Sequence, residues 1–114
     1  MLQEYQGEAR IFFALGQSAS ISAQDATDTD VQAERLNRAL TNYRASIEAS
    51  SEDTEPDRAL RSRAYTAMGR ILSFLERNNE AVQAFDAAIK IGDVRGGAMK
   101  EAQAAKQRMS GGQR

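Results

Sequence analysis

Small and apolar residues recur at steps of three and four along almost the whole chain, and this spacing most constrains the fold. Residues three or four apart lie on one side of an α-helix, so the spacing predicts amphipathic helices. Leu36, Leu40, Tyr43 and Ile47 form one such stripe. The chain has a single proline, Pro56, and no segment alternates apolar and polar residues as a half-buried strand would. The sequence therefore predicts an all-α fold.

Capping and turn signals divide the chain into five expected helices. Thr29, with Gln32 three residues later, matches a capping box, and Pro56 suits the first turn of a helix. The segment 77–79 offers a turn and an asparagine cap, and Gly92 suits a C-terminal stop. We expect helices at about residues 2–23, 31–49, 56–76, 79–91 and 98–109. The connections are short, which predicts antiparallel neighbours.

The expected hairpins repeat one residue pattern. In the second helix of each hairpin, Ala39, Tyr43, Ser46 and Ile47 correspond to Ala81, Phe85, Ala88 and Ile89. In the first helix of each hairpin, Phe12, Leu15 and Gly16 correspond to Tyr65, Met68 and Gly69. The repetition predicts two supersecondary units of one kind.

This pattern resembles the tetratricopeptide repeat, in which W-x2-L-G-x2-Y is followed by A-x3-F, a small residue and a proline. The second hairpin matches it without a gap through Tyr65, Met68, Gly69, Leu72, Ala81, Phe85 and Ala88. Asp93 replaces the closing proline. The resemblance implies a short α-solenoid in which the first helix of each pair lines a concave groove that holds a partner segment.

Packing explains the motif without chemistry. Gly69 and Ala81 are small where the two helices approach most closely, and Phe85 and Tyr65 fill the space beside them. One repeat length after Tyr65 the register reaches Met99, so the last helix continues the pattern as a polar cap. We expect one TPR-like domain over residues 1–109, with hairpins at about 2–49 and 56–91, a capping helix at about 98–109 and a frayed tail at 110–114.

The first hairpin departs from the pattern in length. Gly16 and Ala39 lie much farther apart in the sequence than Gly69 and Ala81, which are their counterparts in the second hairpin. The excess amounts to about three helical turns. Either both helical arms are longer, or the acidic segment 24–30 forms an enlarged loop.

The composition argues against several functions. The net charge is −1, with 15 Lys and Arg against 16 Asp and Glu, so no global field favours nucleic acid or anionic membranes. There is no cysteine or histidine, which argues against disulfides, zinc and a histidine-based catalytic triad. We expect a non-enzymatic protein without cofactor or metal. No signal segment or membrane-spanning run is visible, so we expect a cytoplasmic protein.

The faces left free by the motif provide the candidate binding site. On the third expected helix these are Arg63, Thr66, Arg70 and Ser73, and on the first and last helices they are Arg10, Phe13, Gln17 and Lys100. Guanidinium groups suit carboxylates, so we expect this groove to bind an acidic or C-terminal peptide.

Two alternatives stay open at this level. The charged residues of the candidate binding site can lie on helix faces that contact only solvent. Phe13 and Phe74 can be core residues rather than ligand contacts. The chain can also be a structural subunit that associates with copies of itself, which an unmatched apolar face around Ile11 to Leu15 would favour.

Overall fold

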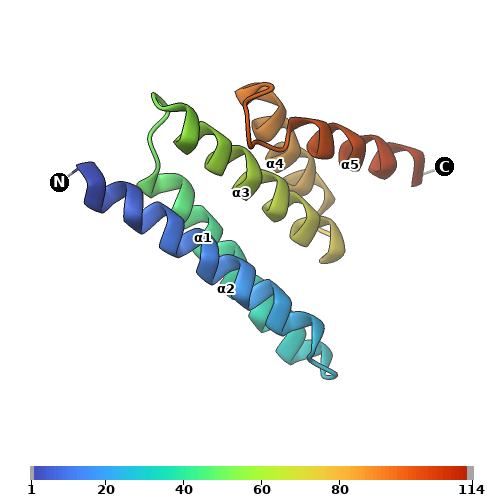
Figure 1. Ribbon diagram of the computed structural model, residues 1–114. Helices are drawn as coiled ribbons and strands as arrows, with labels where there is room; N and C mark the ends of the chain where they lie inside the picture. The colour runs from blue at the N-terminus through green and yellow to red at the C-terminus, as the bar shows by residue number, and fades with distance from the viewer. Residues whose placement is uncertain (1, 113–114) are drawn as a thin grey trace.

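The computed structural model describes residues 2–112 and is all-helical over that range (Figure 1). The five helices are α1 (Leu2–Gln24), α2 (Thr29–Ala49), α3 (Glu55–Phe74), α4 (Asn78–Ile91) and α5 (Met99–Gly112). Helices α1 and α2 form hairpin 1, and α3 and α4 form hairpin 2. Helix α5 packs against both helices of hairpin 2, and the two hairpins pack mainly through α2 and α3. This arrangement confirms the expected all-α helical-hairpin fold.

The same close approach holds each hairpin together. A Cβ atom built on Gly16 would lie 2.9 Å from the ring of Tyr43, and one on Gly69 would lie 2.5 Å from the ring of Phe85. A methyl group at either position would therefore push against the aromatic ring that crosses the facing helix, and it would do so more strongly at Gly69. The rings are buried, with 3% of Tyr43 and 1% of Phe85 exposed. The predicted correspondence between the two hairpins is confirmed at these pairs.

The other motif residues surround these contacts. Ala39, Ala81 and Ala88 have no exposed surface, which allows the helix backbones to approach closely. Phe12 and Tyr65 are only half-buried, so they cover the edge of each hairpin rather than fill its centre.

The extra residues of hairpin 1 lengthen both helical arms. Helix α1 ends at Gln24 and α2 begins at Thr29, which leaves only residues 25–28 as a connection. The enlarged acidic loop is therefore excluded. In Figure 1 the tip of hairpin 1 projects well beyond the end of α3.

Two of the predicted helix caps are wrong. Asp28, not Thr29, caps α2, because its carboxylate accepts hydrogen bonds from the backbone N–H groups of Asp30 (2.7 Å) and Val31 (3.3 Å). Thr29 is instead the first helical residue. The expected asparagine cap of α4 is also absent, since α4 begins at Asn78 and the N-cap residue is Arg77, which makes no side-chain cap bond.

A charge pair lies at the start of α4 in place of an asparagine cap. Arg77 donates two hydrogen bonds to the carboxylate of Glu80, at 2.6 and 2.8 Å. This hydrogen bonding to Arg77 lowers the pKa of Glu80.

The other helix ends follow the expected chemistry more closely. Thr54 caps α3, and Pro56 lies in the first turn, where its missing N–H costs nothing. Gly92 ends α4 with φ at 95°, a region that favours glycine. Helix α5 continues to Gly112, past the expected end at Met109, and residues 113–114 of the expected frayed tail lie outside the described residues.

Candidate functional site

A groove of about 690 Å³ runs between hairpin 1, the inner face of α3 and the start of α5. Its apolar lining comes from Phe13, Ala23, Leu36, Tyr43, Ala67, Ile71, Phe74, Gly97 and Ala98. Its polar lining comes from Gln17, Ser20, Gln24, Gln32, Arg63, Thr66, Arg70 and Glu101. We call this hollow the inner groove. Four of these polar residues were predicted from the sequence as candidate binding residues: Gln17 on α1, and Arg63, Thr66 and Arg70 on α3.

Arg63 and Arg70 supply the positive charge of the inner groove. Both are exposed and lie seven residues apart on α3, about 10.5 Å along the helix axis at 1.5 Å per residue. The ion pairs among the described residues are Arg38–Glu34, Arg61–Glu52, Arg77–Glu80 and Lys106–Asp86. Neither groove arginine belongs to one of these pairs, so both guanidinium groups are available to an anionic ligand.

Phe13 forms part of the groove floor rather than a free contact. Only 8% of its surface is exposed, and its ring meets the ring of Tyr43 edge-on, with centroids 5.4 Å apart. The guanidinium of Arg63 lies 4.8 Å above the centre of the Phe13 ring, within cation–π range. The core interpretation of Phe13 is therefore the better one, and its ring also holds Arg63 over the groove.

Phe74 is the reverse case. It lines the inner groove and is 63% exposed, so the core interpretation of this residue is wrong. Phe74 lies at the C-terminal end of α3, beyond which the arms of hairpin 1 continue. A large exposed ring beside a groove can contact the apolar part of a ligand.

Thr66 is not available to a ligand. Its side chain is 2% exposed, and its hydroxyl donates to the backbone oxygen of Ser62 (2.9 Å), with the oxygen of Ala98 at 3.5 Å. Ser62 in turn accepts a hydrogen bond from the N–H of Ala98 at 2.9 Å. These two hydroxyls therefore attach α3 to the start of α5.

The remaining candidates lie around the inner groove. Arg10 lines an adjacent hollow of about 440 Å³ that it shares with Phe13, Gln17 and Arg63. Ser73 lines another hollow of about 280 Å³ next to Arg70, where Arg108 of α5 also contributes. The positive surface thus continues from α3 towards α5 through Arg108.

Lys100 is exposed and does not line the inner groove. Glu101 occupies the α5 wall instead, because consecutive helical residues point about 100° apart. The expected basic groove therefore contains one acidic side chain opposite its two arginines. The sequence could not predict that Glu101 rather than Lys100 reaches the groove, because this depends on how α5 is rotated against α3.

Residues of the lengthened arms form the far part of the groove. Ala23, Gln24, Gln32 and Leu36 lie in the last turn of α1 and the first turns of α2, and all four line the groove. Gln32 is partly engaged, because its amide donates to the backbone oxygen of Ala23 at 3.4 Å. The sequence did not predict these residues as part of the site, because the extra residues of hairpin 1 could form either longer helices or a loop.

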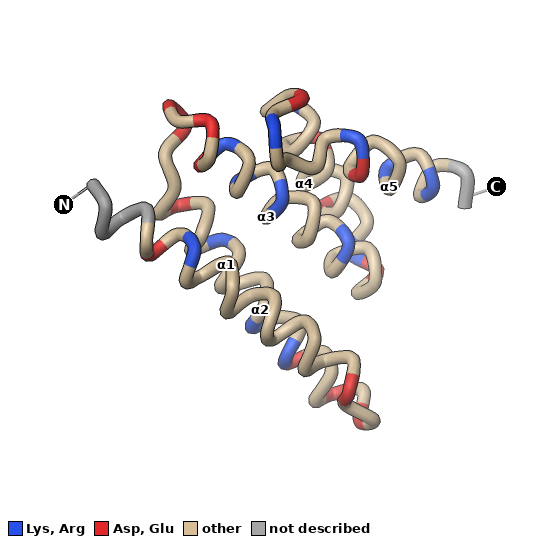
Figure 2. Tube along the Cα trace, in the orientation of Figure 1, with Lys and Arg blue, Asp and Glu red and all other residues tan. Residues whose placement is uncertain are grey.

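Charged residues are distributed unevenly over the hairpins. Helix α1 carries no Lys, Arg, Asp or Glu from Ile11 to Gln24, and Figure 2 shows this stretch in tan. The facing helix α2 carries charges of both signs over its whole length. The α1 wall of the groove therefore offers amide, hydroxyl and apolar groups, and the α3 wall offers the cations.

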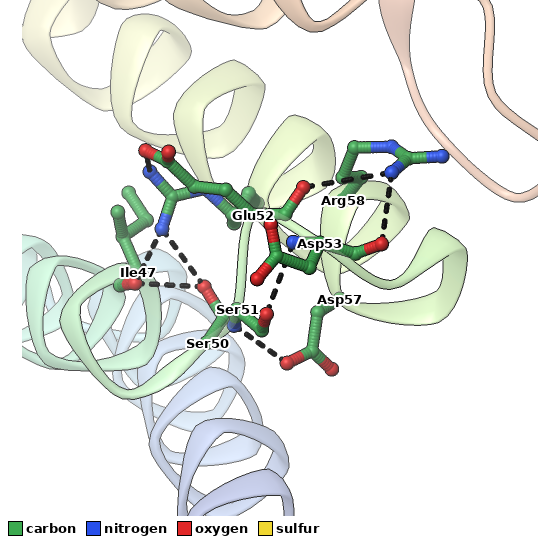
Figure 3. A network of polar contacts seen from close by, with 8 residues as sticks. Ile47, Ser50, Ser51, Glu52, Asp53, Asp57 and Arg58 are labelled. Atoms are coloured by element: carbon green, nitrogen blue, oxygen red, sulfur yellow. Dashed lines mark hydrogen bonds and ion pairs between the residues drawn. The ribbon is translucent and has the colours of Figure 1, made fainter.

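The α2–α3 connection fixes one hairpin against the other (Figure 3). Arg61 of α3 donates to the backbone oxygen of Ile47 (2.8 Å) and to the hydroxyl of Ser50 (3.1 Å), both at the end of α2. The buried carboxylate of Asp57 accepts a hydrogen bond from the N–H of Ser51 at 2.6 Å. These contacts tie the start of α3 to the end of α2, so they set the angle between the groove walls.

The inner groove also contains one buried hydroxyl whose pKa is shifted. Tyr43 lines the groove, and burial raises the pKa of its hydroxyl, which stays neutral near pH 7. Among the described side chains, those of residues 7–110, no group of three or more acidic residues is placed to hold a metal ion. No described helix is long and apolar enough to cross a membrane.

Comparisons of the chain with family models, with curated proteins and with solved structures found no match.

Proposed function

We propose that the chain is a protein-interaction module of the tetratricopeptide-repeat type, which holds an acidic segment of a partner protein in the inner groove. The observation that carries this proposal is the pair Arg63 and Arg70, exposed above an apolar floor and outside every ion pair of the described chain. Each guanidinium can donate two parallel hydrogen bonds to a carboxylate. The volume of about 690 Å³ is in the range of sites that enclose a small ligand or a few peptide residues.

The apolar floor supports the same function. Leu36, Ile71 and Phe74 line the part of the groove beyond Arg70, so a segment with an acidic residue and an apolar residue would use both parts. Phe13 is already fixed beneath Arg63, which limits the freedom that Arg63 loses on binding. The α1 wall adds Gln17 and Gln24, whose exposed amides can donate to and accept from a peptide backbone.

The test is selection of peptides from a random twelve-residue phage library on the immobilised protein. Selected peptides are then synthesised with free and amidated C-termini and titrated against the wild type. We expect them to be acidic and to lose about tenfold or more in affinity for the Arg63→Glu, Arg70→Glu double variant, because charge-assisted hydrogen bonds are lost.

The matched control is the Arg44→Glu, Arg95→Glu double variant, which changes the net charge equally at two exposed positions outside the groove. It should bind the peptides nearly as the wild type does. Equal binding to the groove variant, or an equal loss in the control, would overturn the proposal. A loss confined to the amidated peptides would identify the terminal carboxylate as the group that the arginines bind.

A further inference from the structure

One side of α1 carries a stripe of uncharged residues whose two large side chains are exposed, while Arg35 of α2 reaches its far end and donates to the backbone oxygen of Ser22 at 2.9 Å. Gly7, Ile11, Leu15, Ser18 and Ser22 follow one another at steps of four, four, three and four, so they lie along one side of the helix. Ile11 is 60% exposed and Leu15 is 47% exposed. We call this stripe the α1 end face, because it lies on the end of the hairpin stack opposite to α5.

The internal repeat shows that such a face is built for helix packing. Gly16 and Gly69 make the same contact in their hairpins, so these two positions set the register between α1 and α3. Ile11 then corresponds to Ala64 and Leu15 to Met68, which are 0% and 7% exposed. The face that is buried in hairpin 2 is therefore open in hairpin 1.

The burial in hairpin 2 comes from its contact with hairpin 1. Thr66 points to α5, and residues two positions away on a helix point about 160° from it. Ala64 and Met68 therefore lie on the side of α3 away from α5, where α3 packs against α2. By correspondence, the α1 end face is the side on which a further pair of helices would pack.

The scarcity of charge distinguishes this face from an ordinary solvated one. Charged residues are depleted in the centres of protein interfaces, and α1 has none between Ile11 and Gln24, so the exposed Glu8 near the start of the face is its one described charge. The opposite end of the stack differs, since α5 exposes Lys100, Gln103 and Gln107. A head-to-tail contact would set the apolar stripe against this polar surface, whereas two copies of the stripe match each other.

We propose that the α1 end face binds the same face of a second copy of this chain, with the two α1 helices antiparallel about a twofold axis. This contact places Ile11 of one copy near Leu15 of the second copy, and the small residues Gly7, Ser18 and Ser22 let the helices approach. The inner groove faces another direction, so both copies keep it open. The dimer is weak, because one pair of helices buries less than the roughly 1,200–2,000 Å² of stable complexes.

Sedimentation equilibrium from about 10 µM to 1 mM tests this contact. We expect a wild-type dimer whose dissociation constant falls within about that range. Leu15→Glu should raise the dissociation constant at least tenfold while the far-ultraviolet circular dichroism stays unchanged. Ile21→Glu is the matched control, because Ile21 is 62% exposed on the same helix but lies outside the stripe. A wild-type monomer at 1 mM, or equal weakening by both variants, would overturn the proposal.

Cysteine cross-linking tests the geometry, since the chain has no cysteine of its own. An equal mixture of Ile11→Cys and Leu15→Cys proteins should form disulfide-linked dimers at least fivefold faster than either protein alone. Faster linking within each single variant would indicate parallel helices and overturn the twofold antiparallel contact.

Discussion

Replacement of Gly69 by alanine tests the packing of hairpin 2. In a helix interior, alanine is favoured over glycine by about 1 kcal/mol, so the change would stabilise an exposed position. At Gly69 the new Cβ would lie 2.5, 2.6 and 2.8 Å from three ring atoms of Phe85. Ordinary carbon contacts are about 3.5–4.0 Å, so the ring must move by about 1 Å.

The ring of Phe85 is 1% exposed, so this shift must displace its core neighbours or enter the hollow of about 280 Å³ that the ring lines beside Arg70. Overpacking of this kind costs about 1–3 kcal/mol, which outweighs or cancels the gain in helix propensity. We therefore expect Gly69→Ala to lower the free energy of unfolding by up to about 2 kcal/mol. Urea unfolding followed by circular dichroism at 222 nm measures this as a lower midpoint at unchanged slope.

Two other glycines of the same chain calibrate the result. A methyl group on Gly7 would meet no described atom within 4 Å, so Gly7→Ala should stabilise by up to about 1 kcal/mol. Gly16 is intermediate, with Tyr43 ring atoms at 2.9–3.0 Å and the groove beside that ring, so Gly16→Ala should be nearly neutral.

A double-mutant cycle completes this test. Phe85→Leu removes the ring that meets the new methyl group, so it should make Gly69→Ala less harmful than it is in the wild type. If Gly69→Ala stabilised the protein as much as Gly7→Ala, the close approach of α3 and α4 would be refuted.

The remaining predictions concern single residues. Phe85→Ala should lower the unfolding free energy by about 3–5 kcal/mol, whereas Phe74→Ala should change it by less than about 0.5 kcal/mol; urea unfolding compares the two. Burial raises the pKa of Tyr43, so its contribution to stability is full below the ordinary tyrosine pKa near 10 and is lost as the pH rises through the higher folded value. Tyr43→Phe should therefore lose less stability than the wild type as the pH rises above about 10 in unfolding measurements. Arg61→Ala should broaden the distribution of distances between spin labels on the two hairpins, because the α2–α3 contacts are lost.

The parts of the fold that local chemistry determines could be predicted from the sequence. Helical spacing, Pro56 in a first turn and Gly92 at a helix end each depend on residues within one or two turns. The contact between Gly69 and Phe85 followed from a motif whose members lie in consecutive helices. The length of hairpin 1 could not be decided, because acidic residues suit both a loop and the first turn of a helix.

The site could be predicted only in part, because it depends on how separate helices meet. Both Phe13 and Phe74 lie on inner faces, but only Phe13 is covered by its neighbours. Lys100 and Glu101 are adjacent in sequence, and the rotation of α5 alone decides which of them reaches the groove. Helical periodicity predicts which residues of a helix face the groove only to within about one residue. This precision is too low to decide which of two neighbouring charged residues lines the groove.

Helix α1 brings the two proposed surfaces together on one element. One side packs against α2 through Gly16, a second lines the inner groove through Gln17 and Gln24, and a third is the α1 end face with Ile11 and Leu15. With both proposed contacts made, α1 would be used on three sides, which would account for the uncharged stretch from Ile11 to Gln24. It also separates the two proposals, because a charge introduced at the end face should leave the groove intact. Dimerisation would then place two grooves on one particle, and a partner with two acidic segments would bind more tightly than a partner with one.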